Sequence, residues 1–178
     1  DGFAIGGGHV PHPARRNIDI TYLLFDNGIY GLTKGQTSPT SAIGFHTTTS
    51  PYDNPDQPLN PPLMVLAYGA TWVGQAYAGR PQQLEALIKQ AISHRGFSYL
   101  HILSPCVTFD KTDRTYENLG DLVRDVPAGH DTGNLAAAMA LSRTQRGEPG
   151  RTDHPEQHDD HDGQRAGAQV GGRRDERR

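Results

Sequence analysis

The chain has 178 residues, enough for one domain with a sizeable core, but only 34% of them are hydrophobic, which is low for a globular domain. Its net charge of −3 and the lack of a basic face indicate no nucleic-acid partner. No apolar run is long enough to span a membrane, and no signal peptide is visible, so we expect no membrane association. A single cysteine cannot form an internal disulfide, which fits a cytoplasmic protein.

The first residues predict a glycine-rich segment followed by a weakly encoded helix. The chain opens at Asp1 rather than at a methionine, so we expect a segment to precede it in the natural protein. A helix over Gly6–Arg16 is in doubt, because Pro11 and Pro13 would each cost about 3 kcal/mol in a helix interior. Three adjacent glycines weaken that helix further.

The stretch Leu23–Gln36, LLFDNGIYGLTKGQ, joins a strand to a polar turn. Ile18–Phe25 predicts a buried strand, and its continuous apolar character suits a parallel sheet covered on both faces. In the turn that follows, the side-chain oxygen of Asn27 and the carbonyl of Ile29 are hard ligands suited to Mg²⁺. An ordinary strand-to-loop turn is the alternative, and spacing alone favours it.

The middle of the chain predicts alternating helices and strands. Thr37–Pro62 is a long proline-rich loop, and Leu63–Tyr77 suggests a short helix that leads into a strand. Gly79–Gly96 predicts a helix with Gly96 as its C′ residue, and Phe97–Leu103 predicts a second buried strand. The apolar positions at helical spacing are Leu84, Leu87, Ile88, Ala91 and Ile92. This order predicts an α/β fold with a mostly parallel sheet, and a domain that covers residues 1–125.

Beyond residue 125 the composition changes. Residues 126–142 form a predicted polar linker, with a short helix at Asn134–Ser142. Arg143–Arg178 contains only three hydrophobic residues beside eight arginines and eight acids, and we expect it to be a disordered tail. Because all cations of this tail are arginine, it suggests translation of GC-rich DNA in a shifted reading frame.

Three stretches carry a more specific signal. They read DGFAIGGGH at Asp1–His9, RRNIDITYLLFDNGIYGLTKGQTSPTS at Arg15–Ser41 and SPCVTF at Ser104–Phe109. In this order and spacing they resemble the beta subunit of 2-oxoacid:ferredoxin oxidoreductases, especially the 2-oxoglutarate type. The resemblance runs from about Asp1 to Glu117 and implies a partial, N-terminally truncated thiamine diphosphate-binding domain.

The resemblance also implies roles for individual residues. That family binds thiamine diphosphate through a GDGDG segment, whose second aspartate matches Asp1; its first aspartate, an expected Mg²⁺ ligand, would lie upstream. Asn27 and Ile29 would be Mg²⁺ ligands. The residues expected to bind the cofactor are Asp1, Gly2, Gly31 and Leu32. Lys34 would bind coenzyme A or the substrate carboxylate, although a solvated surface lysine is the simpler interpretation.

Cys106 follows a predicted strand at its carboxyl end, where the ligand sites of open α/β sheets collect. A lone cysteine there is usually a small buried hydrophobic residue. The resemblance instead implies that Cys106 is one of four thiolates that hold a 4Fe–4S cluster. Because the chain has no second cysteine, we expect no cluster to assemble on it alone.

The implied reaction is the oxidative decarboxylation of a 2-oxoacid, 2-oxoglutarate in the closest type, to an acyl-CoA with transfer of electrons to ferredoxin. An alpha subunit is the implied partner, and it is expected to supply the acid that activates the cofactor, so no catalytic residue is assigned in this chain. Three alternatives stay open: a non-functional gene remnant, a different thiamine diphosphate-dependent decarboxylase, and a small α/β binding protein without catalysis.

Overall fold

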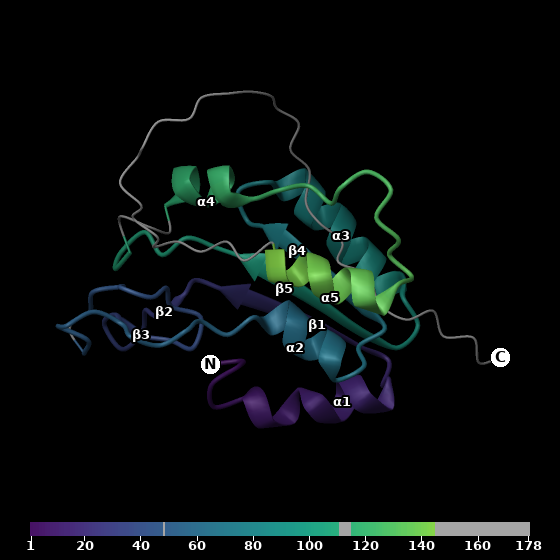
Figure 1. The fold of residues 1–178 in the computed structure, drawn as a ribbon, viewed down its shortest axis with the longest axis horizontal. Coiled ribbons are helices and arrows are strands. Elements are labelled where there is room, and N and C mark those ends of the chain that lie inside the picture. Colours follow the sequence, from purple (N-terminus) through teal and green to yellow (C-terminus); the bar gives the residue numbers. More distant parts are fainter. Residues whose placement is uncertain (48, 111–114, 145–178) are drawn as a thin grey trace.

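The computed structural model describes residues 1–47, 49–110 and 115–144 (Figure 1). The helical elements are η1 (Gly7–His9), α1 (Pro11–Arg16), α2 (Pro61–Ala67), α3 (Pro81–Ser93), α4 (Tyr116–Leu122) and α5 (Leu135–Thr144). The strands are β1 (Ile20–Asp26), β2 (Ile29–Tyr30), β3 (Gln36–Thr37), β4 (Trp72–Tyr77) and β5 (Phe97–Leu103). The prediction of an α/β fold is confirmed.

The central sheet has the strand order β1-β5-β4, and both pairs of neighbours run parallel. In this register His101 on β5 lies opposite Leu24 on β1 and Gln75 on β4. The strand–helix–strand unit of β4, α3 and β5 therefore forms as predicted. All three strands end at the same edge of the sheet, so the residues that follow them meet there.

Helices cover both faces of this sheet (Figure 1). One face packs against α1, α2 and α5 through a buried cluster that includes Val65, Leu66, Tyr99 and Ala138. The opposite face packs against α3 through a second cluster, made up of Trp72, Ala76, Leu87, Ala91, Leu100 and Ile102. The central strand β5 is buried along nearly its whole length because it has neighbours on both sides and helices on both faces.

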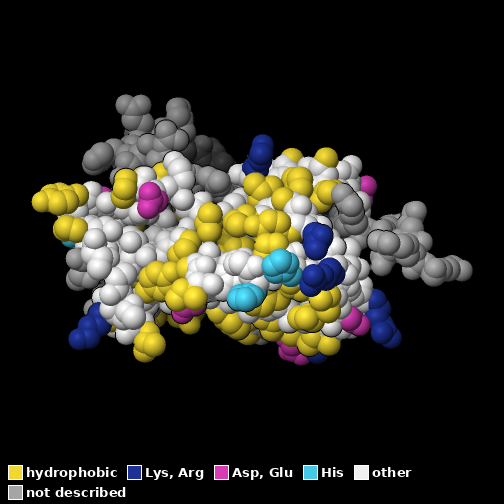
Figure 2. Space-filling model, turned by 90° about the horizontal axis from the view of Figure 1, so that it is seen from below, with side chains coloured by type: hydrophobic (Ala, Val, Ile, Leu, Met, Phe, Trp, Pro, Cys, Tyr) yellow, Lys and Arg dark blue, Asp and Glu magenta, His cyan; other side chains and the backbone are white. Residues whose placement is uncertain are grey.

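The strand predicted at Ile18–Phe25 forms as β1, but the prediction that it is buried is wrong. The strand begins at Ile20 rather than Ile18, and most of its residues are only half-buried. Within the described part of the chain β1 is an edge strand, paired with β5 alone, and the side chain of Phe25 is 61% exposed. Figure 2 views the molecule from the side of α1, where hydrophobic side chains gather on the surface.

The first helix, which the sequence analysis put in doubt, is present in the structure. α1 forms from Pro11 to Arg16, and Pro11 occupies its first position. Both prolines lie in the first turn, where backbone N–H groups have no intrahelical acceptor, so the cost of a proline in a helix interior does not arise. Its C-cap residue, Asn17, adopts a left-handed conformation with φ 48°.

The helix α3 begins as predicted but ends differently. Its last residue is Ser93, and its C-cap residue His94 is extended. Gly96, with φ +116°, therefore lies two residues beyond the cap and is not the C′ residue. Ile92, expected on the apolar face, is 64% exposed.

The helix predicted at Asn134–Ser142 is present as α5, and it extends to Thr144. It is not an isolated helix in a linker, because it packs against α2 and buries Ala138 in the main core. The helix α4, which begins at Tyr116, was not predicted. The tail prediction falls mainly on residues 145–178, outside the described part. Among the described residues, no helix is long and apolar enough to cross a membrane.

Candidate cofactor and metal site

The turn that follows β1 is held by side chains of its own residues. Oδ1 of Asp26 accepts a hydrogen bond from the backbone N–H of Gly28 at 2.9 Å. Oδ1 of Asn27 accepts one from the N–H of Ile29 at 3.3 Å. Ser41 donates its hydroxyl to the carbonyl of Gly28 at 2.6 Å. The two Asx-type bonds and the Ser41 bond fix the turn and leave the second lone pair of the Asn27 oxygen available.

A small pocket of about 50 Å³ opens at this edge of the sheet. Four of the predicted site residues line it: Asp1, Gly2, Asn27 and Ile29. Gly2 packs closely against two side chains of β1. A Cβ at this position would lie 2.5 Å from the Tyr22 hydroxyl and 2.6 Å from Cδ1 of Leu24. The structure therefore brings the N-terminal segment and the Asn27 turn together, although they are separated by about two dozen residues of chain.

Three more of the predicted residues, Gly31, Leu32 and Lys34, lie on the β2–β3 hairpin. Gly31 lies between the Asn27 turn and Cys106: a Cβ built on it would be 3.8 Å from Asn27 Nδ2 and 4.0 Å from Cys106 Sγ. Leu32 is fully exposed, and Lys34 is exposed in a left-handed conformation with φ 75°. Neither of these two side chains lines the small pocket.

A second pocket of about 430 Å³ opens beside the same hairpin. Several polar residues line it, among them Tyr30, Thr37, Ser38, Asn54 and Asp56. It shares Ser38 and Pro39 with the lining of the small pocket, so the two are adjacent.

Cys106 is buried at the carboxyl edge of the sheet, in a small cluster with Ile29, Ala42 and Phe45. The segment that carries it is tied to β1, since the N–H of Ser104 donates to the carbonyl of Asp26 at 3.0 Å. The thiol thus lies close to the predicted cofactor turn. In the described part of the chain no group of three or more His, Cys, Asp or Glu side chains could hold a metal.

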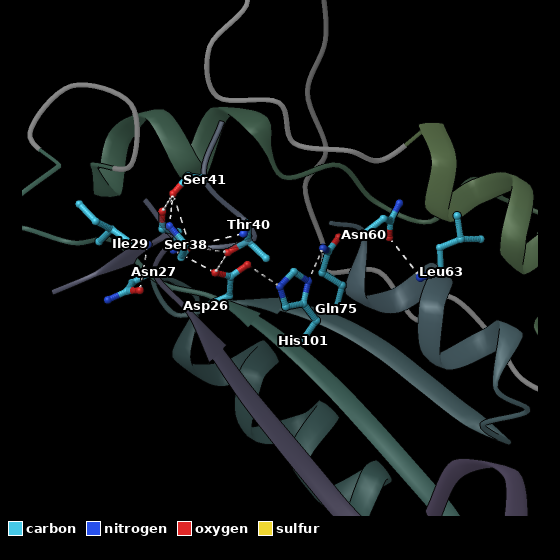
Figure 3. A network of polar contacts seen from close by, with 11 residues as sticks. Asp26, Asn27, Ile29, Ser38, Thr40, Ser41, Asn60, Leu63, Gln75 and His101 are labelled. Atoms are coloured by element: carbon cyan, nitrogen blue, oxygen red, sulfur yellow. Dashed lines mark hydrogen bonds and ion pairs between the residues drawn. The ribbon is translucent and has the colours of Figure 1, made fainter. Parts of the chain in front are cut away.

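A buried polar chain that the sequence interpretation missed runs behind the turn (Figure 3). Asp26 Oδ2 lies 2.9 Å from Nε2 of His101, and His101 Nδ1 lies 3.0 Å from Nε2 of Gln75. The Thr40 hydroxyl donates to the other Asp26 oxygen at 2.6 Å. Two polar residues inside largely apolar strands, His101 in FSYLHIL and Gln75 in WVGQAY, were the signal that could have revealed it.

The aromatic side chains beside this network stay neutral. Burial raises the pKa of Tyr99 well above its ordinary value of 10, and the nearby Asp26 and Tyr22 raise it further. Burial also raises the pKa of Tyr22. The His101 ring stacks on Tyr99, with ring centroids 6.4 Å apart. The buried Asp26 carboxylate thus lies near two tyrosines whose raised pKa keeps them protonated.

The donor set fits Mg²⁺ held together with a diphosphate. Mg²⁺ takes oxygen ligands and is usually bound by one or two carboxylates or similar groups plus phosphate oxygens and waters. The small pocket offers the amide oxygen of Asn27, the carboxylate of Asp1 and backbone carbonyls. Because Gly2 contributes no side chain, its backbone can approach a bound phosphate closely. The donors are too few for the protein alone to complete the metal's coordination, which suits a cofactor that supplies the rest.

The family model of thiamine pyrophosphate enzymes, C-terminal TPP binding domain, matches residues 1–102, more than half of the 178-residue chain. The chain belongs to this family. The Asn27 turn, the small pocket and all of the central sheet except the last residue of β5 lie within the matched residues.

The chain is 44% identical over 119 residues to 2-oxoacid:ferredoxin oxidoreductase 2, subunit beta, of Aeropyrum pernix, which covers 66% of this chain and 38% of that protein. It is 44% identical over 110 residues to 2-oxoglutarate oxidoreductase subunit KorB of Mycobacterium tuberculosis, covering 62% of this chain and 30% of the relative. These matches confirm the resemblance to the beta subunits.

A solved structure agrees. The 2-oxoglutarate:ferredoxin oxidoreductase from Magnetococcus marinus, with 2-oxoglutarate, coenzyme A and succinyl-CoA bound, superposes with a TM-score of 0.77 and 54% sequence identity. The match covers 80% of this chain and 48% of that one. This TPP-binding domain therefore spans less than half the length of the relatives that it matches.

Proposed function

We propose that this chain binds Mg²⁺ and thiamine diphosphate as part of the beta subunit of a 2-oxoacid:ferredoxin oxidoreductase. The observation that carries the proposal is the small pocket in which Asp1 and Gly2 meet the Asn27 turn. These are the positions that the family resemblance assigns to the diphosphate and the metal. Membership of the TPP-binding family and the named beta-subunit relatives support the same assignment.

In the proposed site, Asn27 Oδ1 and the Ile29 carbonyl hold the metal, while Asp1 and Gly2 lie beside the diphosphate. Gly31 and Leu32 bind the cofactor from the hairpin, Leu32 through its backbone because its side chain faces solvent. When bound, thiamine diphosphate supplies the carbanion chemistry that decarboxylates a 2-oxoacid. The residues of this chain supply position and electrostatics, and the acid that activates the cofactor is expected on an alpha subunit.

The remaining partners follow from the relatives. We assign 2-oxoglutarate as the 2-oxoacid, coenzyme A as the acyl acceptor and ferredoxin as the electron acceptor, in line with the names of the matched proteins. Lys34, exposed on the hairpin beside the larger polar pocket, is proposed to bind a carboxylate of the substrate or coenzyme A. Cys106 is proposed as one ligand of a 4Fe–4S cluster whose other three thiolates lie outside this sequence.

The test is a calorimetric titration of the chain with thiamine diphosphate in excess Mg²⁺, comparing Asn27→Ala with Asn134→Ala. Both substitutions remove a side-chain oxygen that accepts a backbone N–H, at Ile29 and at Ala137 respectively, but Asn134 lies at the start of α5. We expect Asn27→Ala to weaken binding by about tenfold or more, as loss of one charge-assisted contact does. Asn134→Ala should bind like the wild type. Equal affinity in all three proteins would contradict the proposal.

A further inference from the structure

Asp26 has its two carboxylate oxygens committed to opposite sides. Oδ1 accepts the N–H of Gly28 at 2.9 Å and the Thr40 hydroxyl at 2.6 Å, so it shapes the turn that carries Asn27. Oδ2 lies 2.9 Å from His101 Nε2. The side chain is buried, and Figure 3 shows it between the turn and the imidazole. The orientation of one oxygen therefore depends on what holds the other.

The orientation of His101 is itself fixed. His101 and Gln75 are register partners on neighbouring strands, and Asp26 lies two residues beyond the third partner, Leu24, so their side chains share one face of the sheet. The Gln75 amide nitrogen can only donate, which makes His101 Nδ1 the acceptor and places the proton of a neutral imidazole on Nε2, facing Asp26. Stacking on Tyr99 restrains the ring further.

We propose that His101, oriented by Gln75, is a positioning residue for the metal–diphosphate site: it anchors Oδ2 of Asp26 so that Oδ1 can hold the Asn27 turn in its ligand-binding shape. This inference rests on the proposed function. His101 does not line the small pocket, so it acts through Asp26 rather than by touching a ligand. Hydrogen-bond partners that orient metal-binding residues in this way control metal affinity without contacting the metal.

The variants at His101 and Ser98 lie on β5, and the variant at Gln75 lies on β4. His101→Leu removes the donor to Asp26, whereas His101→Gln keeps an N–H donor at a similar distance from the backbone. Ser98→Ala is the matched control, because Ser98 is equally buried on the same strand and its hydroxyl has no hydrogen-bond partner within the described residues. Gln75→Leu, which leaves the Asp26–His101 contact in place, serves if His101→Leu does not fold.

Two readouts are measured on each variant of the chain. One is the affinity for Mn²⁺ in the presence of thiamine diphosphate, by electron paramagnetic resonance, and the other is amide exchange at Gly28 and Ile29. We expect His101→Leu to lose about 10- to 100-fold in Mn²⁺ affinity, the usual effect of removing such a partner. Exchange at Gly28 and Ile29 should accelerate in parallel. His101→Gln should restore both readouts most of the way, Gln75→Leu should show a smaller loss, and Ser98→Ala should match the wild type.

Wild-type affinity in a folded His101→Leu, or in a folded Gln75→Leu where His101→Leu does not fold, would overturn this inference and leave the proposed function standing. So would an equal loss in Ser98→Ala, because it would show a general effect of altering the core of β5. Failure of the wild-type chain to bind Mn²⁺ with thiamine diphosphate would instead overturn the proposed function and this inference with it. Restoration in His101→Gln distinguishes positioning from simple packing, since only positioning depends on the donor.

Discussion

At the scale of single residues, Gly96 lies where only a glycine leaves room for the side chain of Asn17. Its φ is +116°, and a Cβ would overlap the Asn17 amide. That amide oxygen accepts hydrogen bonds from the Thr71 hydroxyl at 2.7 Å and the Phe97 N–H at 2.8 Å. The absence of a side chain at Gly96 therefore leaves room for these Asn17 hydrogen bonds at the amino end of the sheet.

We expect Gly96→Ala to lower the free energy of unfolding by about 1–2 kcal/mol more than Gly69→Ala does, because it also disturbs the Asn17 hydrogen bonds. Gly69 is the matched control: its φ is +96°, but nothing lies within 4 Å of its added Cβ. Urea unfolding of the two variants measures the difference. Equal destabilisation would show that backbone strain alone matters at Gly96.

Tyr99 predicts a dependence of stability on alkaline pH. Its phenol is buried, and burial followed by the charge of Asp26 raises its pKa well above 10. Above pH 10 the unfolded chain loses this proton while the native state keeps it, so native stability falls as pH rises, by about 1.4 kcal/mol per pH unit for one such group.

Urea unfolding between pH 9 and pH 11.5 tests this point in Tyr99→Phe, in which we expect the decline to be shallower than in the wild type. At neutral pH the same variant should cost little, because the Tyr99 hydroxyl has no hydrogen-bond partner among the described residues. Tyr52→Phe, at an exposed position, should keep the wild-type slope. Identical slopes in all three proteins would contradict the assignment to Tyr99.

At the scale of elements, Asn60 couples two helices. Its oxygen accepts the N–H of Leu63 at 3.1 Å and caps α2, while its amide nitrogen donates to the carbonyl of Ser142 in α5 at 2.7 Å. Asn60→Asp keeps the cap and loses the donor, whereas Asn60→Ala loses both. Amide exchange should therefore accelerate in α5 alone for the aspartate variant and in both helices for the alanine variant. Unchanged exchange in α5 would mean that packing around Ala138 holds the helix by itself.

At the scale of the whole molecule, periodicity predicted most of the architecture. The strand at Phe97–Leu103 and the helix after Gly79 carry unambiguous patterns, and both form. Burial of β1 was predicted wrongly, because an apolar run does not reveal whether a strand lies at the centre or at the edge of its sheet. The first helix was doubted because proline destabilises the interior of a helix, whereas both prolines of α1 lie in its first turn.

The candidate site was predictable only in part. Resemblance identified the Asn27 turn and the segment at Asp1, and the structure places them around one pocket. The Asp26–His101–Gln75 chain was not found, because its members are about 75 residues apart in sequence at their widest and meet only through strand register. Local patterns cannot show which polar residues of two strands become neighbours.

The central claim is that the Asn27 turn binds a metal together with a diphosphate. The most direct measurement is the anomalous scattering of Mn²⁺ in crystals of the chain grown with Mn²⁺ and thiamine diphosphate. We expect one peak at about 2 Å from both Asn27 Oδ1 and the Ile29 carbonyl, with diphosphate density beside Gly2. Diphosphate density with its metal peak away from the turn, or a peak that persists at the same place in Asn27→Ala, would contradict the account.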